Sequence, residues 1–442
     1  GQGLVLNNDF MIPKSWMMNS LVRRTQSPKR HFSTSEYGFF RGAATTINIG
    51  RMDITSFYSN KRIDANLSDD GEITSFKTDG YHRTAGELGK KKNTRELVTG
   101  ANVNYRNGYF QIGLSGVYYG YDRNYNPKLK LYNQYYLRDS TYVNAGIDYS
   151  YRTGGLIFAG ETAVAKNGAT ATINMLQFVP SSEFNLTVLY RYYPIRYNAL
   201  YANAFSEGGD VRNEKGLYVG SLFSPFRNMS VSVYVDVVRF PWLKYRVDRD
   251  SRAIDIYLSG TYRLSGASDL ELRYKFKQKE KNATYPDDKT VTVLPYDTHK
   301  LRLRFETTTA AGWNFRTTAD GSFYQQKNFP PEKGIMFSQN IGYRGNHRIR
   351  GDLFAGYFYS DSYSARLYSY ERNLLSSFYM PSFYGNGIRV ALSARYNISR
   401  QLSFSLKTGH TTYFDRESIG SSTEKISGNS RTDIYTYIRW KF

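Results

Sequence analysis

Apolar and polar residues alternate with a period of two along most of the chain. In residues 300–306 every second side chain is leucine or phenylalanine, and the residues between them are charged. The same alternation recurs in residues 229–237, 270–277, 388–396 and 433–442. Successive side chains of a strand point to opposite faces, so this pattern predicts strands with one apolar face and one polar face.

The length of these segments separates a membrane-spanning strand from a soluble one. An apolar band about 25 Å tall, crossed by a strand tilted by about 40°, requires about ten residues, and the segments have this length. Soluble strands are most often about five or six residues long. The alternative, a soluble all-β protein, would need a second sheet to cover each apolar face.

Short and long connections between the segments alternate along the chain. Tight turns are expected at residues 49–51, 107–108, 152–154, 180–182, 224–227, 264–266, 310–312, 344–346 and 398–400. Longer polar stretches are expected at residues 8–35, 63–94, 121–138, 194–214, 281–297, 360–386 and 415–430. Short turns on one side and long loops on the other are typical of outer-membrane β-barrels.

The chain is therefore predicted to be all-β, a single large antiparallel transmembrane β-barrel of about 20 strands, within a range of about 18 to 22. Turns would be periplasmic, loops extracellular and both termini periplasmic, with the opening residues GQGLVL as the first strand. Residues 363–375 fit either a strand pair or an ordered part of a loop. Residues 1–442 form one barrel domain, and we expect a signal peptide and a periplasmic region upstream of them.

Composition supports a membrane barrel and excludes several other classes. The chain has 41 Tyr and 27 Phe, yet only 40% of its residues are hydrophobic and its mean hydropathy is −0.56. No segment approaches the roughly 18 apolar residues of a membrane helix, and disordered chains are poor in aromatics. Aromatic girdles at two lipid–water interfaces account for the tyrosine and phenylalanine content. The absence of cysteine excludes disulfides and thiolate metal sites.

Basic residues dominate the polar faces of the predicted strands. The chain carries 59 Lys and Arg against 38 Asp and Glu, a formal charge of +21. A wall lined by one sign of charge concentrates ions of the opposite sign, and basic rings select anions in pores. The alternative is that these residues pair with carboxylates of a plug or of neighbouring strands, or meet anionic lipid headgroups at the rims. The predicted lumen face consists of Arg191, Arg273, Lys275, Lys277, Lys300, Arg302, Arg304, Arg348, Arg350, Arg389, Arg395 and Lys407.

Two further basic segments lie in predicted loops, at residues 14–31 and at residues 90–92. They could bind polyanions such as nucleic acid or lipopolysaccharide phosphates, or they could be ordinary solvated loops beside an anionic leaflet.

Motifs for catalysis and metal binding find little support. Residues 122–126 place oxygen ligands at alternate positions, as a calcium loop does, but lack its glycine and distal glutamate, so a polar turn is the better interpretation. Residues 69–72 are read as a turn for the same reason. His410 and Asp415 are conceivable as an acid–base pair, although an interfacial or lumenal histidine is the favoured interpretation. No metalloprotease, phosphate-loop or serine-hydrolase motif occurs. We expect no enzyme activity, no cofactor and no metal.

Both ends of the chain resemble a known family. The matching segments are GQGLVL at the start, residues 33–44, residues 57–65, residues 365–373, residues 380–385 and the final Arg439, Trp440, Lys441 and Phe442. They are similar to the barrel region of Bacteroidota outer-membrane proteins that carry helix-hairpin-helix repeats upstream. Trp440 and Phe442 also resemble the terminal signal read by the barrel-assembly machinery.

The resemblance implies a bacterial outer-membrane location, with lipid, lipopolysaccharide and the barrel-assembly machinery as partners. Helix-hairpin-helix units elsewhere bind nucleic acid, which makes DNA a candidate cargo, but these 442 residues contain no such repeat. The predicted function is a channel or conduit for anionic solutes or polyanions. The alternative is an anchoring subunit of an envelope protein complex, with a plugged barrel. The solute, gating, partners and oligomeric state cannot be read from the sequence.

Overall fold

The computed structural model describes residues 1–7, 13–18, 28–31, 33, 37–285, 288–345 and 348–441. These residues form two compact units. Unit 1 comprises Gly1–Leu222, Tyr234–Ile254 and Glu280–Val293, and unit 2 comprises Phe223–Val233, Asp255–Lys279 and Leu294–Phe442. Nineteen of the strands belong to a single sheet.

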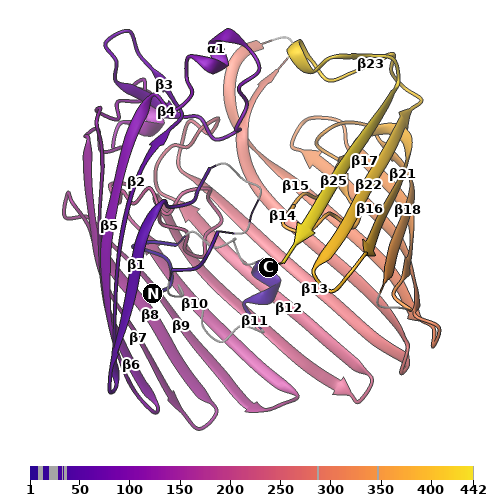
Figure 1. The fold of residues 1–442 in the computed structure, drawn as a ribbon, viewed down its shortest axis with the longest axis horizontal. Coiled ribbons are helices and arrows are strands. Elements are labelled where there is room, and N and C mark those ends of the chain that lie inside the picture. The colour runs from indigo at the N-terminus through magenta and orange to yellow at the C-terminus, as the bar shows by residue number, and fades with distance from the viewer. Residues whose placement is uncertain are drawn as a thin grey trace. The chain divides into compact units, whose positions relative to one another are not determined.

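Eight strands of unit 1 pair in chain order, each antiparallel to the next. Figure 1 shows β5 to β10 side by side in indigo to magenta. The eight strands are β1 (Gly42–Ile49), β2 (Met52–Ile63), β5 (Thr94–Asn107), β6 (Phe110–Tyr121), β7 (Thr141–Thr153), β8 (Leu156–Ala165), β9 (Thr170–Ser181) and β10 (Phe184–Tyr193).

Unit 2 contains most of a second run of antiparallel neighbours, whose first strand begins in unit 1 and continues in unit 2 from Leu294. These are β15 (Asp288–Thr308), β16 (Trp313–Gln326), β17 (Glu332–Tyr343), β18 (Ile349–Ser360), β21 (Gly385–Asn397), β22 (Leu402–Tyr413) and β25 (Ser430–Trp440). The remaining sheet strands are β11 (Glu214–Phe226), β12 (Met229–Phe240), β13 (Ser251–Ser265) and β14 (Ser268–Tyr285).

The connections carry small elements of their own. Three two-stranded hairpins are β3 (Ala65–Leu67) with β4 (Ile73–Phe76), β19 (Leu367–Tyr368) with β20 (Ser382–Phe383), and β23 (Ser418–Ile419) with β24 (Ile426–Ser427). One short helix, α1 (Ala85–Leu88), and three 3-10 turns, η1 (Lys14–Trp16), η2 (Leu131–Asn133) and η3 (Ser422–Glu424), complete the described elements. None of the helices in the described residues is long and apolar enough to cross a membrane.

The two faces of the strands differ in the way that the sequence predicts. On β15, Leu301 and Leu303 are 52% and 47% exposed, whereas Arg302 between them is only partly exposed and is held by hydrogen bonds. On β12, Val235 and Val237 are exposed and Asp236 is fully buried. The large apolar side chains thus face outward and the polar side chains face other parts of the chain. We call the second surface the polar face.

The predicted fold class is confirmed, because the chain is all-β and is built on one large antiparallel sheet of the kind found in outer-membrane barrels. The strand count of 19 falls within the predicted range, one below its central value.

The prediction that GQGLVL is the first strand is wrong. Gly3 has a φ of +97°, a left-handed conformation that interrupts an extended run. The backbone N–H groups of Leu4 and Val5 donate to the carboxylate of Glu161 instead of to a neighbouring strand. The apolar residues of this segment are buried because they pack against the polar face. From the sequence alone, apolar residues that are buried in this way look the same as the apolar residues of a strand.

Two predicted loops also differ. Residues 281–297 were expected to be a long loop, but β14 and β15 continue through most of them as an extended hairpin. In residues 363–375 the structure shows part of a long connection from β18 to β21, with β19 and β20 as a hairpin inside it and outside the large sheet. The turn at residues 344–346 is described only up to Gly345.

Candidate functional site

The polar face of unit 1 contains a fully buried cluster of charges. Arg191 on β10 donates through Nε to Glu214 Oε1 at 2.5 Å and through Nη1 and Nη2 to Asp236 at 2.9 and 3.0 Å. All three side chains are inaccessible to solvent. A buried guanidinium is tolerated only with such complete pairing, because isolated charges are very costly to remove from water.

Lys14 extends this cluster from a distant part of the sequence. Its ammonium group hydrogen-bonds to Glu207 and to Asp236, and its backbone oxygen accepts a hydrogen bond of 2.9 Å from the hydroxyl of Tyr218. The segment 13–18 is therefore fixed to the polar face by charge as well as by backbone contacts.

The first seven residues are held on the same face by a second carboxylate. Glu161 on β8 stands directly opposite Asp148 on β7, a like-charge pair that would be unfavourable on its own. Glu161 accepts hydrogen bonds from the backbone N–H groups of Leu4 at 3.2 Å and Val5 at 3.1 Å. Residues 1–7 and 13–18, which we call the N-terminal segment, thus cover part of the polar face of unit 1.

In unit 2, many of the predicted lumen cations pair with carboxylates of neighbouring strands. Arg302 forms two hydrogen bonds with Asp320, its cross-strand partner, at 2.6 and 3.2 Å. The other pairs of this kind are Arg304 with Glu271, and Lys275 and Lys277 with Asp255. Arg273 also pairs with Glu271, which lies two residues before it on the same strand. Pairing with neighbouring strands was one of the two interpretations offered by the sequence, and the contacts between strands fit it.

A long connection supplies a further carboxylate. Residues 361–384, which we call the inner loop, place Glu371 between Arg389 on β21 and Lys407 on β22, with N–O distances of 2.7 Å to each. Burial alone raises the pKa of Glu371, but the hydrogen bonds and charges of Arg389 and Lys407 outweigh burial and hold the pKa below its ordinary value. Arg372 beside it pairs with Asp352 of β18.

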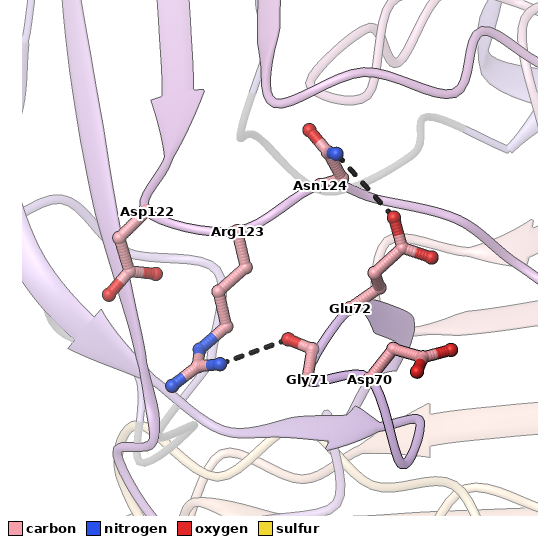
Figure 2. Close-up of a pocket in the computed structure, with 6 residues that line it drawn as sticks. All are labelled: Asp70, Gly71, Glu72, Asp122, Arg123 and Asn124. Atoms are coloured by element: carbon pink, nitrogen blue, oxygen red, sulfur yellow. Dashed lines mark hydrogen bonds between the residues drawn. The ribbon is translucent and has the colours of Figure 1, made fainter.

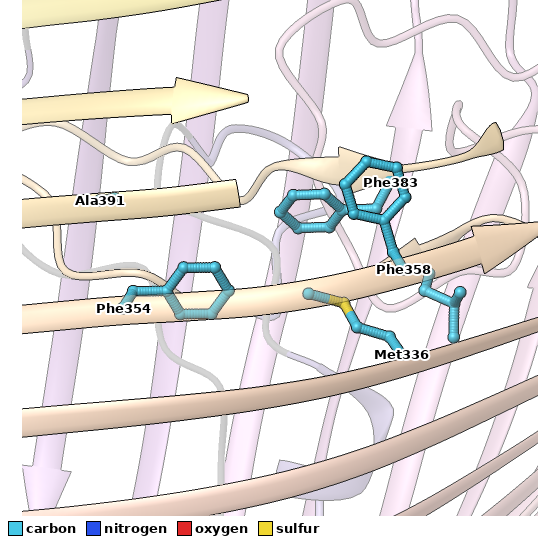
Figure 3. Packing of buried hydrophobic residues seen from close by; sticks show 6 residues of the cluster. Met336, Phe354, Phe358, Phe383 and Ala391 are labelled. Carbon is cyan, nitrogen blue, oxygen red and sulfur yellow. The ribbon is translucent and has the colours of Figure 1, made fainter. Parts of the chain in front are cut away.

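An apolar cluster fixes the inner loop next to these ion pairs. Leu367 and Phe383 of the inner loop pack with Met336, Phe354, Phe358 and Ala391 of the strands. Figure 3 shows the ring of Phe383 close to Phe358, and the ring centroids are 5.1 Å apart. Because all six residues are nearly or fully buried, the inner loop is docked by packing as well as by charge.

Several cations of unit 2, Arg439 of β25 among them, have no carboxylate within 4 Å among the described residues. Four of these cations form two groups. Arg350 on β18 and Arg395 on β21 are direct cross-strand partners, and Arg395 hydrogen-bonds only to neutral groups of Asn397 and Ser403. Lys300 on β15 and Arg366 on the inner loop both lie against the ring of Tyr368, at 5.0 and 5.7 Å from its centroid.

The predicted site residues are therefore distributed unevenly. Arg191 alone lies in unit 1, and the structure places the other eleven in unit 2. Arg348 lies in the turn before β18 with an exposed side chain. Trp440 ends β25, paired with Leu402, and is 67% exposed. Phe442 lies outside the described residues, as do residues 19–27 of the predicted basic loop.

A recess of about 560 Å³ joins the two segments that resembled calcium loops. Figure 2 shows Arg123 directed at the carbonyl oxygen of Gly71 and Asn124 directed at Glu72. The acidic side chains that line the recess are Asp70, Glu72 and Asp122. No group of three or more residues that could hold a metal occurs in the described part of the chain.

Sequence reasoning missed the residues that reach the polar face from outside the large sheet. Lys14 was assigned to an external loop, and Glu371, Arg366 and Tyr368 were noted only for a family resemblance. The sequence signal that could have identified this segment is the charged pair Glu371 and Arg372, which follows the apolar and aromatic residues of 365–370. It does not reveal which strand the segment contacts.

The comparisons with known proteins give similarity of fold. No protein-family model and no curated protein matches the chain. Similar solved structures include the siderophore receptor PirA of Acinetobacter baumannii (TM-score 0.49, 7% identity, 90% of this chain and 70% of that chain). The FrpB iron transporter of Neisseria meningitidis gives a TM-score of 0.48 at 10% identity over 90% of this chain and 72% of that chain. A loop-deletion mutant of OmpT, an outer membrane protein of Vibrio cholerae, gives 0.35 at 11% identity over 67% of this chain and 90% of that chain.

Proposed function

We propose that this chain is a β-barrel of the bacterial outer membrane that serves as a conduit for anionic solutes. The observation that carries the membrane part is the face of exposed apolar side chains, exemplified by Leu301, Leu303 and Phe305 of β15. Exposure of this large apolar surface to water would be unfavourable, whereas contact with lipid tails would remove it from water.

The preference for anions is supported by the cations of unit 2 that have no carboxylate partner among the described residues, above all by the cross-strand pair Arg350 and Arg395. Like charges directly opposite each other are unfavourable in a sheet. They become favourable when an anion passes between or beside them, as in the basic rings of anion-selective pores.

Membrane insertion is tested with a charge on the apolar face. Leu303→Arg places a cation in the lipid tails and is expected to cost about 2–4 kcal/mol, so the protein should fail to insert. Leu303→Ala is the matched control and should insert. A wild-type protein that stays monomeric in buffer without detergent would contradict the proposal.

Conduction is tested in planar bilayers under a salt gradient. We expect a reversal potential that favours anions for the wild-type protein, and a shift toward cations for the double variant Arg350→Gln with Arg395→Gln. Arg316→Gln, which removes a cation already paired with Glu306, is the control and should change selectivity less. A selectivity that is identical in all three proteins would contradict the anion conduit.

A second candidate function is an anchoring subunit of an envelope complex, with a plugged barrel. The observation that favours it is the coverage of polar face by the N-terminal segment and by the inner loop. A protein that is silent in bilayers and co-purifies with stoichiometric partners would support this function. We propose no catalytic step for this chain. Polyanions, including DNA, are larger solutes that the same conduit could carry.

Membership of the helix-hairpin-helix outer-membrane family is proposed from the segments that resemble it, together with periplasmic termini and Trp440 and Phe442 as an assembly signal. Removing the side chains of these two residues should lower the yield of inserted barrel without altering conduction by the molecules that do insert. Unchanged insertion would contradict the assembly role.

A further inference from the structure

The surroundings of Lys300 are rich in hydrogen-bond donors and poor in acceptors. The described residues include no hydrogen-bond partner for the Lys300 ammonium group, whose contact is with the face of the Tyr368 ring at 5.0 Å. Asp320, on the neighbouring strand β16, is engaged by the guanidinium group of Arg302. Three N–H donors of Lys300 are therefore unused.

Arg366 brings a second cation to the same aromatic ring from the inner loop. Its Nε donates to the hydroxyl of Tyr368 at 2.7 Å, and its Nη1 donates to the backbone oxygen of Tyr363 at 2.7 Å. Two of its five N–H donors are thus engaged, and three remain. Because the hydroxyl of Tyr368 accepts from Arg366, its own proton is left to donate.

Lys300 and Arg366 carry like charges and lie at 5.0 and 5.7 Å from the centroid of the same ring, so they repel each other. The docked inner loop brings Arg366 and Tyr368 to Lys300, so the two cations share one ring in spite of their mutual repulsion. An anion would relieve this repulsion and satisfy the unused donors of both groups.

We propose that Lys300, Arg366 and Tyr368 form a binding site for a phosphoryl group. The donors are suited to a tetrahedral oxyanion, because the lysine supplies a compact charge and the arginine supplies N–H groups in a fixed plane. Both side chains are partly exposed, so a solute can reach them. The inference rests on the proposed anion conduit and assigns it a substrate class of phosphate and phosphorylated small solutes.

The site differs from the other cations of unit 2 in ways that provide controls. Lys277 is paired with Asp255, and Arg372 on the inner loop is paired with Asp352. Removing either of these changes the net charge by the same amount as removing Lys300 or Arg366, but leaves the donors of the proposed site in place.

The test is calorimetric titration of the detergent-solubilised full chain with inorganic phosphate and, in a second arm, with glycerol phosphate. We expect binding to the wild-type protein and a loss of affinity of about tenfold or more for Lys300→Gln and for Arg366→Gln, as removal of a charge-assisted contact implies. Lys277→Gln and Arg372→Gln should bind as the wild type does. Affinity for inorganic phosphate alone would identify the free ion as the ligand, and equal affinity for both would identify any phosphoryl group.

The site would be refuted if the wild-type protein bound neither compound, or if the control variants lost as much affinity as Lys300→Gln and Arg366→Gln did. Tyr368→Phe keeps the ring and removes the hydroxyl, so it should weaken binding less than either charge removal while the inner loop stays docked. The resistance of the inner loop to protease checks the folding of each variant. Because binding is measured in micelles, its failure is distinguishable from failure of the conduit, which is measured as anion selectivity in bilayers.

Discussion

The polar faces of the two units hold their charges in contrasting ways. In unit 1, Arg191, Glu214 and Asp236 are fully buried and directly paired, and Lys14 joins them from the N-terminal segment. In unit 2, Glu371 forms one nearly buried cluster with Arg389 and Lys407. Arg273, Arg302 and Arg304, however, are 25–34% exposed, and other cations there lack a carboxylate among the described residues. A buried charge network tolerates no loss of a partner, whereas a hydrated one can exchange a partner for a solute. The first arrangement suits structure, and the second suits binding and passage.

The largest effect is expected from Arg191→Met. This change leaves Glu214 and Asp236 buried with one cation fewer, and breaking such a network costs about 3–5 kcal/mol. The free energy of unfolding of the refolded protein in micelles, measured by urea titration, should fall by this amount. Arg316→Met is the control in unit 2, where the partly exposed pair with Glu306 contributes about 0–1 kcal/mol. Similar losses for both variants would remove the contrast between the units.

The second effect concerns how firmly the inner loop is docked. Phe383→Ala removes a ring that packs on Phe354 and Phe358, and truncation of a buried phenylalanine costs about 3 kcal/mol or more. Proteolysis of residues 361–384 should accelerate by about a hundredfold, because cleavage follows the population of the open loop. Leu375→Ala, at an exposed position of the same loop, should leave the rate nearly unchanged. Equal rates for the two variants would show that packing does not hold the loop.

Glu371→Gln tests the charge that docks the same loop. It weakens hydrogen bonds to Arg389 and Lys407, each charge-assisted contact being worth about 1–3 kcal/mol. It leaves Lys407 without a carboxylate partner among the described residues, whereas Arg389 keeps Asp433. Both the protease sensitivity of the inner loop and the anion selectivity in bilayers should rise. A variant with lower anion selectivity would contradict the assignment.

The pH dependence of the same contact has a definite sign. The pKa of Glu371 is lowered in the folded protein, so its contribution is complete above the ordinary value of 4.5 and is lost as the pH falls through the lowered pKa. Protease cleavage of the wild-type inner loop should therefore accelerate below pH 4.5, and Glu371→Gln should not show this acceleration. A loop whose cleavage responded to acid equally in both proteins would exclude Glu371 as the cause.

The sequence predicts the strands and their two faces, because side-chain direction follows directly from a period of two. The exposed Leu301 and Leu303 and the inward Arg302 need no tertiary information. The partners on the polar face depend on strand register, which a single strand does not reveal. Arg350 and Arg395 are 45 positions apart, and only the pairing of β18 with β21 places them opposite each other.

The contacts made by segments outside the large sheet could not be predicted from the sequence. Leu4 and Val5 belong to a short apolar run that resembles a buried strand, yet their backbone N–H groups donate to Glu161 and not to a neighbouring strand. Glu371 stands in a polar stretch that resembles a surface loop, and its two cationic partners lie on strands later in the chain. Contacts of this kind are set by tertiary packing, which local patterns do not encode.

The smallest effect is expected at the rim of unit 1, where Lys166 pairs with Asp139 at 2.6 Å with both side chains about one-third exposed. The hydrogen bond from Lys166 is the main cause that lowers the pKa of Asp139, but water screens this exposed pair. Lys166→Gln should change the free energy of unfolding by about 0.5 kcal/mol or less in the assay used for Arg191→Met. The two variants each remove one cation from the same unit. If Lys166→Gln lowered the free energy of unfolding as much as Arg191→Met does, the importance of a charge would depend on its position in unit 1 and not on its burial.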